Sequence, residues 1–90
     1  MKTDKLFQVV KKQIDAFDAY GLLKCDAPED EFDIESRMIT AQLRKGMTTY
    51  SIAEIIAQVM NKQFENIFRA QEFISYAEQI EKFLNNTDLE

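Results

Sequence analysis

The sequence contains no histidine and a single cysteine, Cys25, and both scarcities exclude kinds of chemistry. Histidine is the commonest transition-metal ligand and the usual general base of enzymes. One cysteine cannot form an intrachain disulfide or supply a zinc pair, and the surrounding acids disfavour the reactive thiolate. We therefore expect a protein that is not an enzyme, with no catalytic residues, no metal site and no cofactor.

Glycine and proline are also scarce, with two Gly and one Pro in 90 residues. This scarcity favours helices over a β fold that is rich in turns. No apolar run approaches the roughly 20 residues that cross a bilayer, and the charged N-terminal stretch does not resemble a signal peptide. We expect one cytoplasmic domain over residues 1–90 that does not enter a membrane.

Apolar residues recur at helical spacing in four segments. The expected helices are residues 4–19, 34–45, 52–65 and 69–85, with an acidic loop at residues 20–33. Their predicted buried faces comprise Leu6, Val10, Ile14 and Phe17, then Ile34, Met38, Ile39 and Leu43, then Ile52, Ile55, Ile56, Val59 and Met60, and finally Phe73, Ala77, Ile80 and Leu84. Four helices with short connections predict an all-α protein, a small antiparallel four-helix bundle.

Side chains that cap helices predict where the second and third helices begin and end. Asp33 is expected to be the N-cap of the second helix, and Gly46 is expected to end it. Ser51 and Glu54 have the spacing of a capping box at the start of the third helix.

Neither Gly nor Pro occurs between Ile52 and Leu84, so this stretch is compatible with one long helix. Such a helix would be about 50 Å long, which is excessive for a domain of this size. Its apolar stripe would also drift out of phase between the two halves. We therefore predict a break near Asn66.

The net charge of −5 is concentrated in one segment. Residues 15–35 contain eight acids and one base, Lys24, whereas the rest of the chain has eight acids and ten bases. Binding to nucleic acid or to anionic membranes requires clustered Lys and Arg, which this chain lacks. We expect neither as a partner.

The acidic segment does not match an EF-hand that begins at Asp26. Position 3 would be Pro28, position 6 would be Glu31 instead of Gly, and position 12 would be Arg37 instead of Glu. A weak site for Ca²⁺ or Mg²⁺ is a less favoured alternative, because these cations accept varied oxygen ligands. Stabilisation of the positive N-terminal end of the second helix explains most of the charge.

A protein-binding surface is the functional hypothesis for the same segment. Its candidate residues are Asp26, Glu29, Asp30, Glu31, Phe32 and Glu35, with Phe32 expected to be exposed. Most of the ten aromatic residues are expected in the core, and an exposed remainder would favour dimerisation or a protein partner.

Two groups of residues in this segment resemble a known family. Gly21-Leu22-Leu23, followed by Ala27 to Asp33 (APEDEFD) and Glu35, is similar to the signature of the YugE-like proteins of bacilli. The likeness is specific over about fifteen residues, and Asp26 stands where a Gly often precedes the Ala-Pro step. The resemblance implies a small helical protein without an established activity, so it supplies no catalytic residue.

Three functions therefore remain open at this point. The favoured one is a cytoplasmic protein-interaction or regulatory module that uses the acidic segment to bind another protein, which can be basic, or a second copy of itself. A toxin-immunity-type protein that binds a basic partner is the alternative to it. The second is a weak binder of divalent cations, and the third is a homodimer formed through apolar surface on the last two helices.

Overall fold

The computed structural model describes residues 2–17, 31–64 and 67–86. Helix α1 spans Lys2–Phe17, α2 spans Asp33–Gln42 and α3 spans Thr49–Phe64. A short 3₁₀ helix, η2 (Ala70–Phe73), leads directly into α4 (Ile74–Asn86). No strand occurs in these three ranges.

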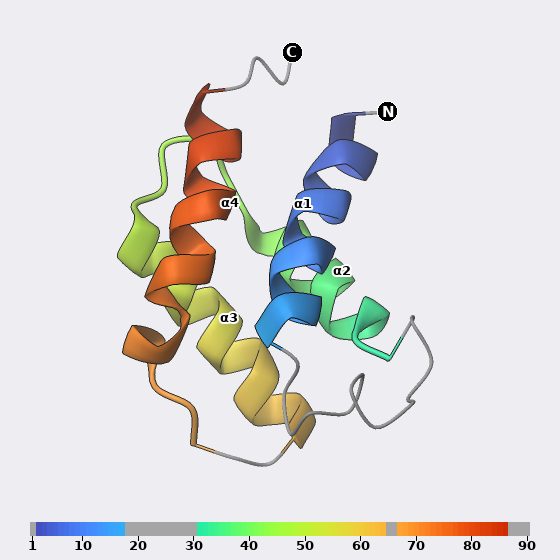
Figure 1. The fold of residues 1–90 in the computed structure, drawn as a ribbon, viewed down its shortest axis with the longest axis vertical. Coiled ribbons are helices and arrows are strands. Elements are labelled where there is room, and N and C mark those ends of the chain that lie inside the picture. Colours follow the sequence, from blue (N-terminus) through green and yellow to red (C-terminus); the bar gives the residue numbers. More distant parts are fainter. Residues whose placement is uncertain (1, 18–30, 65–66, 87–90) are drawn as a thin grey trace.

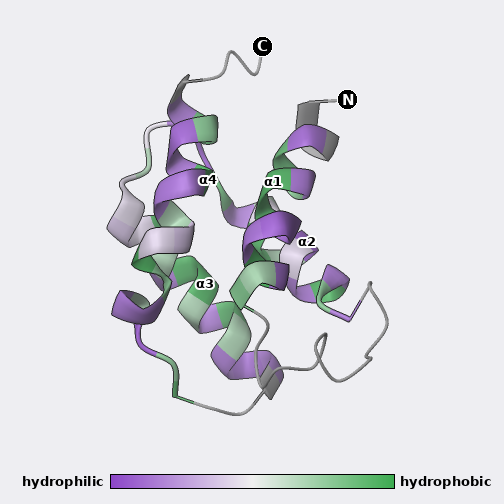
Figure 2. Ribbon diagram, in the orientation of Figure 1, coloured by the Kyte–Doolittle hydropathy of each residue, from purple (hydrophilic) through white to green (hydrophobic). Residues whose placement is uncertain are grey.

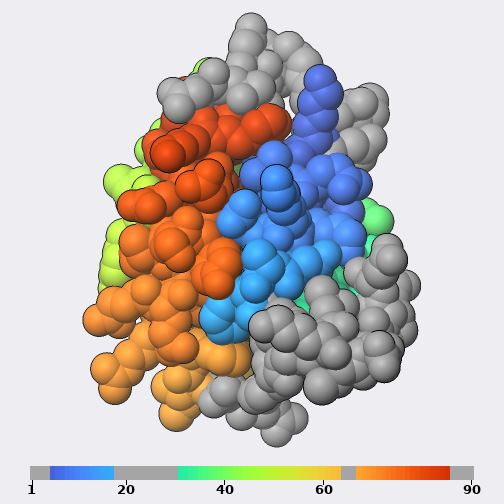
Figure 3. Space-filling model, in the orientation of Figure 1, coloured from blue at the N-terminus to red at the C-terminus, as the bar shows by residue number. Residues whose placement is uncertain are grey.

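Helix α4 packs against both α1 and α3. It runs antiparallel to each of them, and α2 packs across α1 and α3 (Figure 1). Figure 3 shows α1 and α4 lying side by side on one face of the molecule. The predicted all-α, antiparallel four-helix bundle is confirmed for the described residues, and none of their helices is long and apolar enough to span a membrane.

The core is built from the helix faces that the apolar spacing predicts (Figure 2). Three of the predicted residues of α1 and all four of the predicted set at Phe73–Leu84 are buried, and Phe17 and Ile55 pack at the edge of the core. The buried set of hydrophobic residues is Leu6, Val10, Ile14, Phe32, Ile39, Leu43, Ile52, Ala53, Ile56, Ala57, Val59, Met60, Phe73, Ala77, Ile80 and Leu84.

The predicted buried face of α2 is wrong in one respect. Ile34 was expected inside but is 66% exposed, whereas Phe32, which was expected outside, is fully buried. Phe32 is the larger side chain, and its insertion sets the phase of the helix. Successive turns from Phe32 then bury Ser36, Ile39 and Leu43, and Ile34 points to the opposite side.

Helix α2 ends at Gln42, three residues before the predicted end at residue 45. Leu43 is already extended, and Gly46 lies in the following turn with a φ of +96°, in the left-handed region that glycine tolerates best. Arg44 still binds carbonyl groups at the C-terminal end of the helix. Its Nη1 donates hydrogen bonds to the carbonyl oxygens of Ala41 (3.2 Å) and Leu43 (2.8 Å).

The predicted capping box at Ser51 and Glu54 is also wrong, because α3 begins earlier, at Thr49. The cap is Thr48, whose Oγ1 accepts a hydrogen bond from the backbone N–H of Ser51 at 3.1 Å. The same hydroxyl lies 3.0 Å from the Ser51 hydroxyl. Both Thr48 and Ser51 are acceptable caps, and the position of the preceding turn selects the first one.

The break predicted near Asn66 is confirmed, since residues 67–69 are not helical. The side-chain amide of Asn61 pairs with the backbone of Phe68: its Nδ2 donates to the Phe68 carbonyl (3.0 Å), and its Oδ1 accepts from the Phe68 N–H (2.5 Å). Glu72 then caps η2 by accepting a hydrogen bond from the Arg69 N–H at 2.9 Å. The turn is thus fixed by polar side chains in a stretch without glycine or proline.

Aromatic rings close the end of the bundle beside this turn. Phe17 of α1 lies 5.7 Å from Phe68, 4.6 Å from Phe73 and 5.7 Å from Tyr76, measured between ring centroids. The ring centroids of Phe68 and Phe73 are 5.7 Å apart, and the two rings meet edge to face. These four aromatic residues are therefore part of the core region and not an exposed patch.

Asn85, near the end of α4, fixes the turn between α2 and α3. Its Oδ1 accepts a hydrogen bond from the Gly46 N–H (2.6 Å), and its Nδ2 donates to the Met47 carbonyl (3.1 Å) and to Glu81 Oε2 (2.7 Å). One side chain thus connects two segments that are about 40 residues apart in sequence.

We predict that Asn85→Ala lowers the free energy of unfolding by about 1–2 kcal/mol, because two backbone groups of the turn lose their partner. Urea denaturation followed by circular dichroism measures this change. Gln79→Ala, at an exposed position of the same helix, is the control and should change stability by less than about 0.5 kcal/mol. Equal effects of the two substitutions would contradict the role assigned to Asn85.

Candidate functional site

The structure describes only part of the acidic segment that the sequence proposes as a binding surface. Asp26, Glu29 and Asp30 lie outside the described residues. Glu31 is exposed to solvent. Phe32 is fully buried and Glu35 is 7% exposed, so neither can contact a partner directly in this conformation.

Asp33 and Asp15 share one lysine. Lys11 Nζ lies 2.7 Å from Asp33 Oδ1 and 3.1 Å from Asp15 Oδ2, which joins α1 to the start of α2. Asp33 was expected to cap α2, but Phe32 is the N-cap residue and no side chain supplies that cap. The Asp33 carboxylate forms the ion pair with Lys11 instead.

The pKa of Lys11 is raised above its usual value of 10.5. Burial by itself would lower this pKa, because it penalises the charged ammonium. The hydrogen bonds to Asp33 and Asp15, together with their negative charges, outweigh that penalty. Lys11 therefore remains a cation at neutral pH and offsets one of the two negative charges of these aspartates.

Two polar groups of α2 are buried without a partner. Among the described residues, Glu35 Oε1 and the fully buried Ser36 Oγ accept or donate no hydrogen bond. Their position follows from the insertion of Phe32, which turns this side of α2 inward. Unsatisfied groups of this kind lower stability, because burial removes their bonds to water.

The carboxylates that the structure describes in this segment do not form a metal centre. No group of three or more Cys, Asp or Glu side chains with the geometry for a metal ion occurs within residues 2–17, 31–64 and 67–86. The described acids of residues 15–35 have different surroundings instead. Asp15 and Asp33 pair with Lys11, Glu35 is buried, and Glu31 is exposed to solvent.

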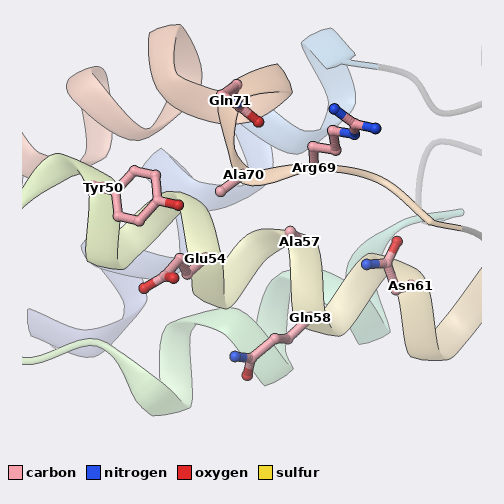
Figure 4. Close-up of a pocket in the computed structure, with 8 residues that line it drawn as sticks. All are labelled: Tyr50, Glu54, Ala57, Gln58, Asn61, Arg69, Ala70 and Gln71. Carbon is pink, nitrogen blue, oxygen red and sulfur yellow. The ribbon is translucent and has the colours of Figure 1, made fainter.

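A second candidate site is a groove between α3 and the start of η2 (Figure 4). Its volume is about 330 Å³, and it is open to solvent along its length. Five residues of α3 and three residues of the following segment line it: Tyr50, Glu54, Ala57, Gln58, Asn61, Arg69, Ala70 and Gln71. Ala57 is nearly buried, so this small side chain forms part of the floor.

The rim of this groove is polar and carries both signs of charge. Glu54, Gln58, Arg69 and Gln71 are exposed, and no ion pair or side-chain hydrogen bond to another described residue engages their terminal groups. Tyr50 is 54% exposed at one end of the groove. The sequence gives no direct signal for this site, because the groove exists only where α3 and η2 meet.

No protein-family model matches the chain, and no curated protein or solved structure matches it significantly. The resemblance to the YugE-like proteins therefore stays a prediction that rests on the residues between Gly21 and Glu35.

We predict that Lys11→Met lowers the free energy of unfolding at neutral pH by about 1 kcal/mol, since it removes both ion pairs. The raised pKa gives the effect a defined pH dependence. The contribution is fully present below pH 10.5 and is lost as the pH rises through the higher pKa of the folded state. Urea denaturation of the wild type and the variant at neutral and strongly alkaline pH measures the difference.

Lys12→Met provides the matched control, because Lys12 is exposed one position further along α1. This substitution should have only a small effect on the free energy of unfolding, because the exposed Lys12 forms no ion pair with another described residue. A loss of stability in Lys11→Met that stays constant up to strongly alkaline pH would contradict the ion-pair explanation.

For the buried hydroxyl, we predict that Ser36→Ala raises the free energy of unfolding by about 0.5–1 kcal/mol. The substitution removes an unsatisfied polar group and introduces a better helix former. Thermal denaturation compares it with Ser75→Ala, an exposed position in α4 that tests helix propensity alone. Destabilisation by Ser36→Ala would show that this hydroxyl has a favourable partner.

Proposed function

We propose that this chain is a non-enzymatic, cytoplasmic protein-interaction module that binds a basic surface of a partner protein. The observation that carries the proposal is the charge imbalance of residues 15–35, where eight acids accompany one base. A local negative field of this kind speeds encounter with a basic partner and disfavours acidic ones.

The contacts of the described acids narrow the proposed contact region. Lys11 pairs with Asp15 and Asp33 and offsets one of their two negative charges, and Glu35 is buried. Glu31 is exposed in the turn just before α2. We therefore assign the contact to Asp26, Glu29, Asp30 and Glu31. Phe32 supports the conformation of this segment from inside, and we assign Glu35 no direct role in the contact.

An immunity-type protein that neutralises a basic toxin fits this description, as does a regulatory adaptor. The two differ in the identity of the partner and not in the physical basis of binding. Weak binding of a divalent cation by the same carboxylates is the competing proposal, and titration calorimetry with Ca²⁺, Mg²⁺ and Mn²⁺ tests it directly.

The decisive experiment compares two variants that change the net charge equally. Asp30→Asn combined with Glu31→Gln neutralises the proposed contact, whereas Glu78→Lys makes the same change of two charges at one exposed acid of α4 that does not line the groove. Each variant and the wild type are used to capture partners from a bacterial lysate at salt concentrations of roughly 0.05 and 0.5 M, between which screening increases strongly.

We expect the wild type and the control to retain a basic partner at low salt and to lose it at high salt. The variant of Asp30 and Glu31 should lose it at both concentrations. Capture that is insensitive to salt, or that is equal for the two charge-matched variants, would exclude an electrostatic contact through this segment.

A further inference from the structure

Helix α2 has an apolar stripe on its outer face. The helix packs against α1 and α3 and lies at the edge of the bundle (Figure 1). Ile34, Met38 and Ala41 are spaced by four and three residues, so they share the face opposite the fully buried Ser36. Ile34 is 66% exposed, Ala41 is exposed and Met38 is partly buried. These three residues are the apolar stripe of α2.

The charge of Arg37, which neighbours the stripe, is held on the side of α1. Its guanidinium carbon lies 4.5 Å from the centroid of the Phe7 ring, in a cation–π contact. The charge therefore covers an aromatic ring of α1 and does not interrupt the stripe. From Ile34 to Ala41 the apolar surface extends for about 10 Å along the helix.

The two ends of the stripe carry opposite charges. Glu31, three residues before Ile34, is exposed and forms no ion pair with another described residue. At the other end, Arg44 Nη1 donates a hydrogen bond to the Ala41 carbonyl at 3.2 Å, which places the guanidinium beside the last residue of the stripe. The other guanidinium nitrogens of Arg44 bond to no described residue.

This order of acid, apolar stripe and base is complementary to a second copy of itself. If two α2 helices pack antiparallel about a two-fold axis midway between Ile34 and Ala41, each Ile34 faces the Ala41 of the other copy. The same register places each Glu31 opposite the Arg44 of the other copy. A partner that is only basic matches the acidic end and is repelled at the end where Arg44 lies. The pattern therefore favours a second copy as the occupant.

We propose that the apolar stripe of α2 forms a weak homodimer, in which two copies pack antiparallel and pair Glu31 with Arg44 at both ends. One helix face is smaller than a standard protein–protein interface, so the dissociation constant is roughly micromolar or weaker. The contact lies on α2 and not on the last two helices, where apolar surface was expected to support a homodimer.

Sedimentation equilibrium of the purified full-length chain tests the proposal from about 10 µM to 1 mM. The mass of the wild type should rise from that of one chain toward that of two. Ile34→Gln should weaken the dimer by about tenfold, because an apolar contact is lost at two places in each dimer. Ile67→Gln is the matched control, since Ile67 is 86% exposed between α3 and η2, and it should leave dimerisation unchanged.

Exchanging the signs of the charged pair tests the antiparallel register. Glu31→Arg and Arg44→Glu should each weaken the dimer by about tenfold, because two attractive pairs become repulsive. The double variant restores opposite charges across the interface and should recover most of the dimer. Loss of the hydrogen bonds that Arg44 donates cannot explain this pattern, because the double variant lacks them too. Lys82→Glu, at an exposed base of α4, makes the same change in net charge as Arg44→Glu and should leave dimerisation unchanged.

Three results would overturn the proposal. A wild type that sediments as one chain up to about 1 mM would leave this face of α2 for a different protein. Equal dimerisation of Ile34→Gln and Ile67→Gln would place the contact elsewhere, and a double variant as weak as the single ones would exclude the antiparallel register.

The dimer and the proposed contact with a basic partner fail independently. Sedimentation uses the purified chain alone, so its result does not depend on that partner. Ile34→Gln keeps every acid of residues 15–35 and should still capture the basic partner at low salt. Circular dichroism confirms that each variant is folded.

Discussion

The burial of one apolar stripe, on η2 and α4, determines the arrangement of the other helices. Phe73, Ala77, Ile80 and Leu84 are all at most 1% exposed, and they are covered by α1 on one side and α3 on the other. Since α4 must run antiparallel to α3 to do this, the chain has to reverse direction between them. Both the turn and the groove beside it are consequences of this requirement.

Polar side chains then specify how the helices meet at their ends. Lys11 connects α1 to α2, Asn61 holds the backbone of Phe68, and Asn85 holds the turn at Gly46. Each of these contacts joins segments distant in sequence or reverses the chain locally. Hydrophobic burial supplies most of the stabilisation of the fold, whereas directional hydrogen bonds select one register among several that would bury similar area.

The orientation of α2 shows that burial of an aromatic side chain can outweigh the cost of burying polar groups. Inserting Phe32 into the core brings Glu35 and Ser36 inward, where Glu35 Oε1 and Ser36 Oγ have no hydrogen-bond partner among the described residues. The same rotation places Ile34 in solvent. The gain from burying a large aromatic side chain exceeds the cost of two poorly satisfied polar atoms. The same arrangement leaves Glu31, the residue directly before Phe32, exposed to solvent.

The sequence by itself determined the class of fold, the apolar faces of α1, α3 and α4, the break between α3 and α4, and the concentration of acids in residues 15–35. These features depend on residue type and periodic spacing, which are local properties of the chain. Tertiary structure decided the rest: the inward position of Phe32, the pairing of Asp33 with Lys11, the cap at Thr48 and the groove between α3 and η2. Each of these depends on which surface lies opposite, and residues remote in sequence supply that surface.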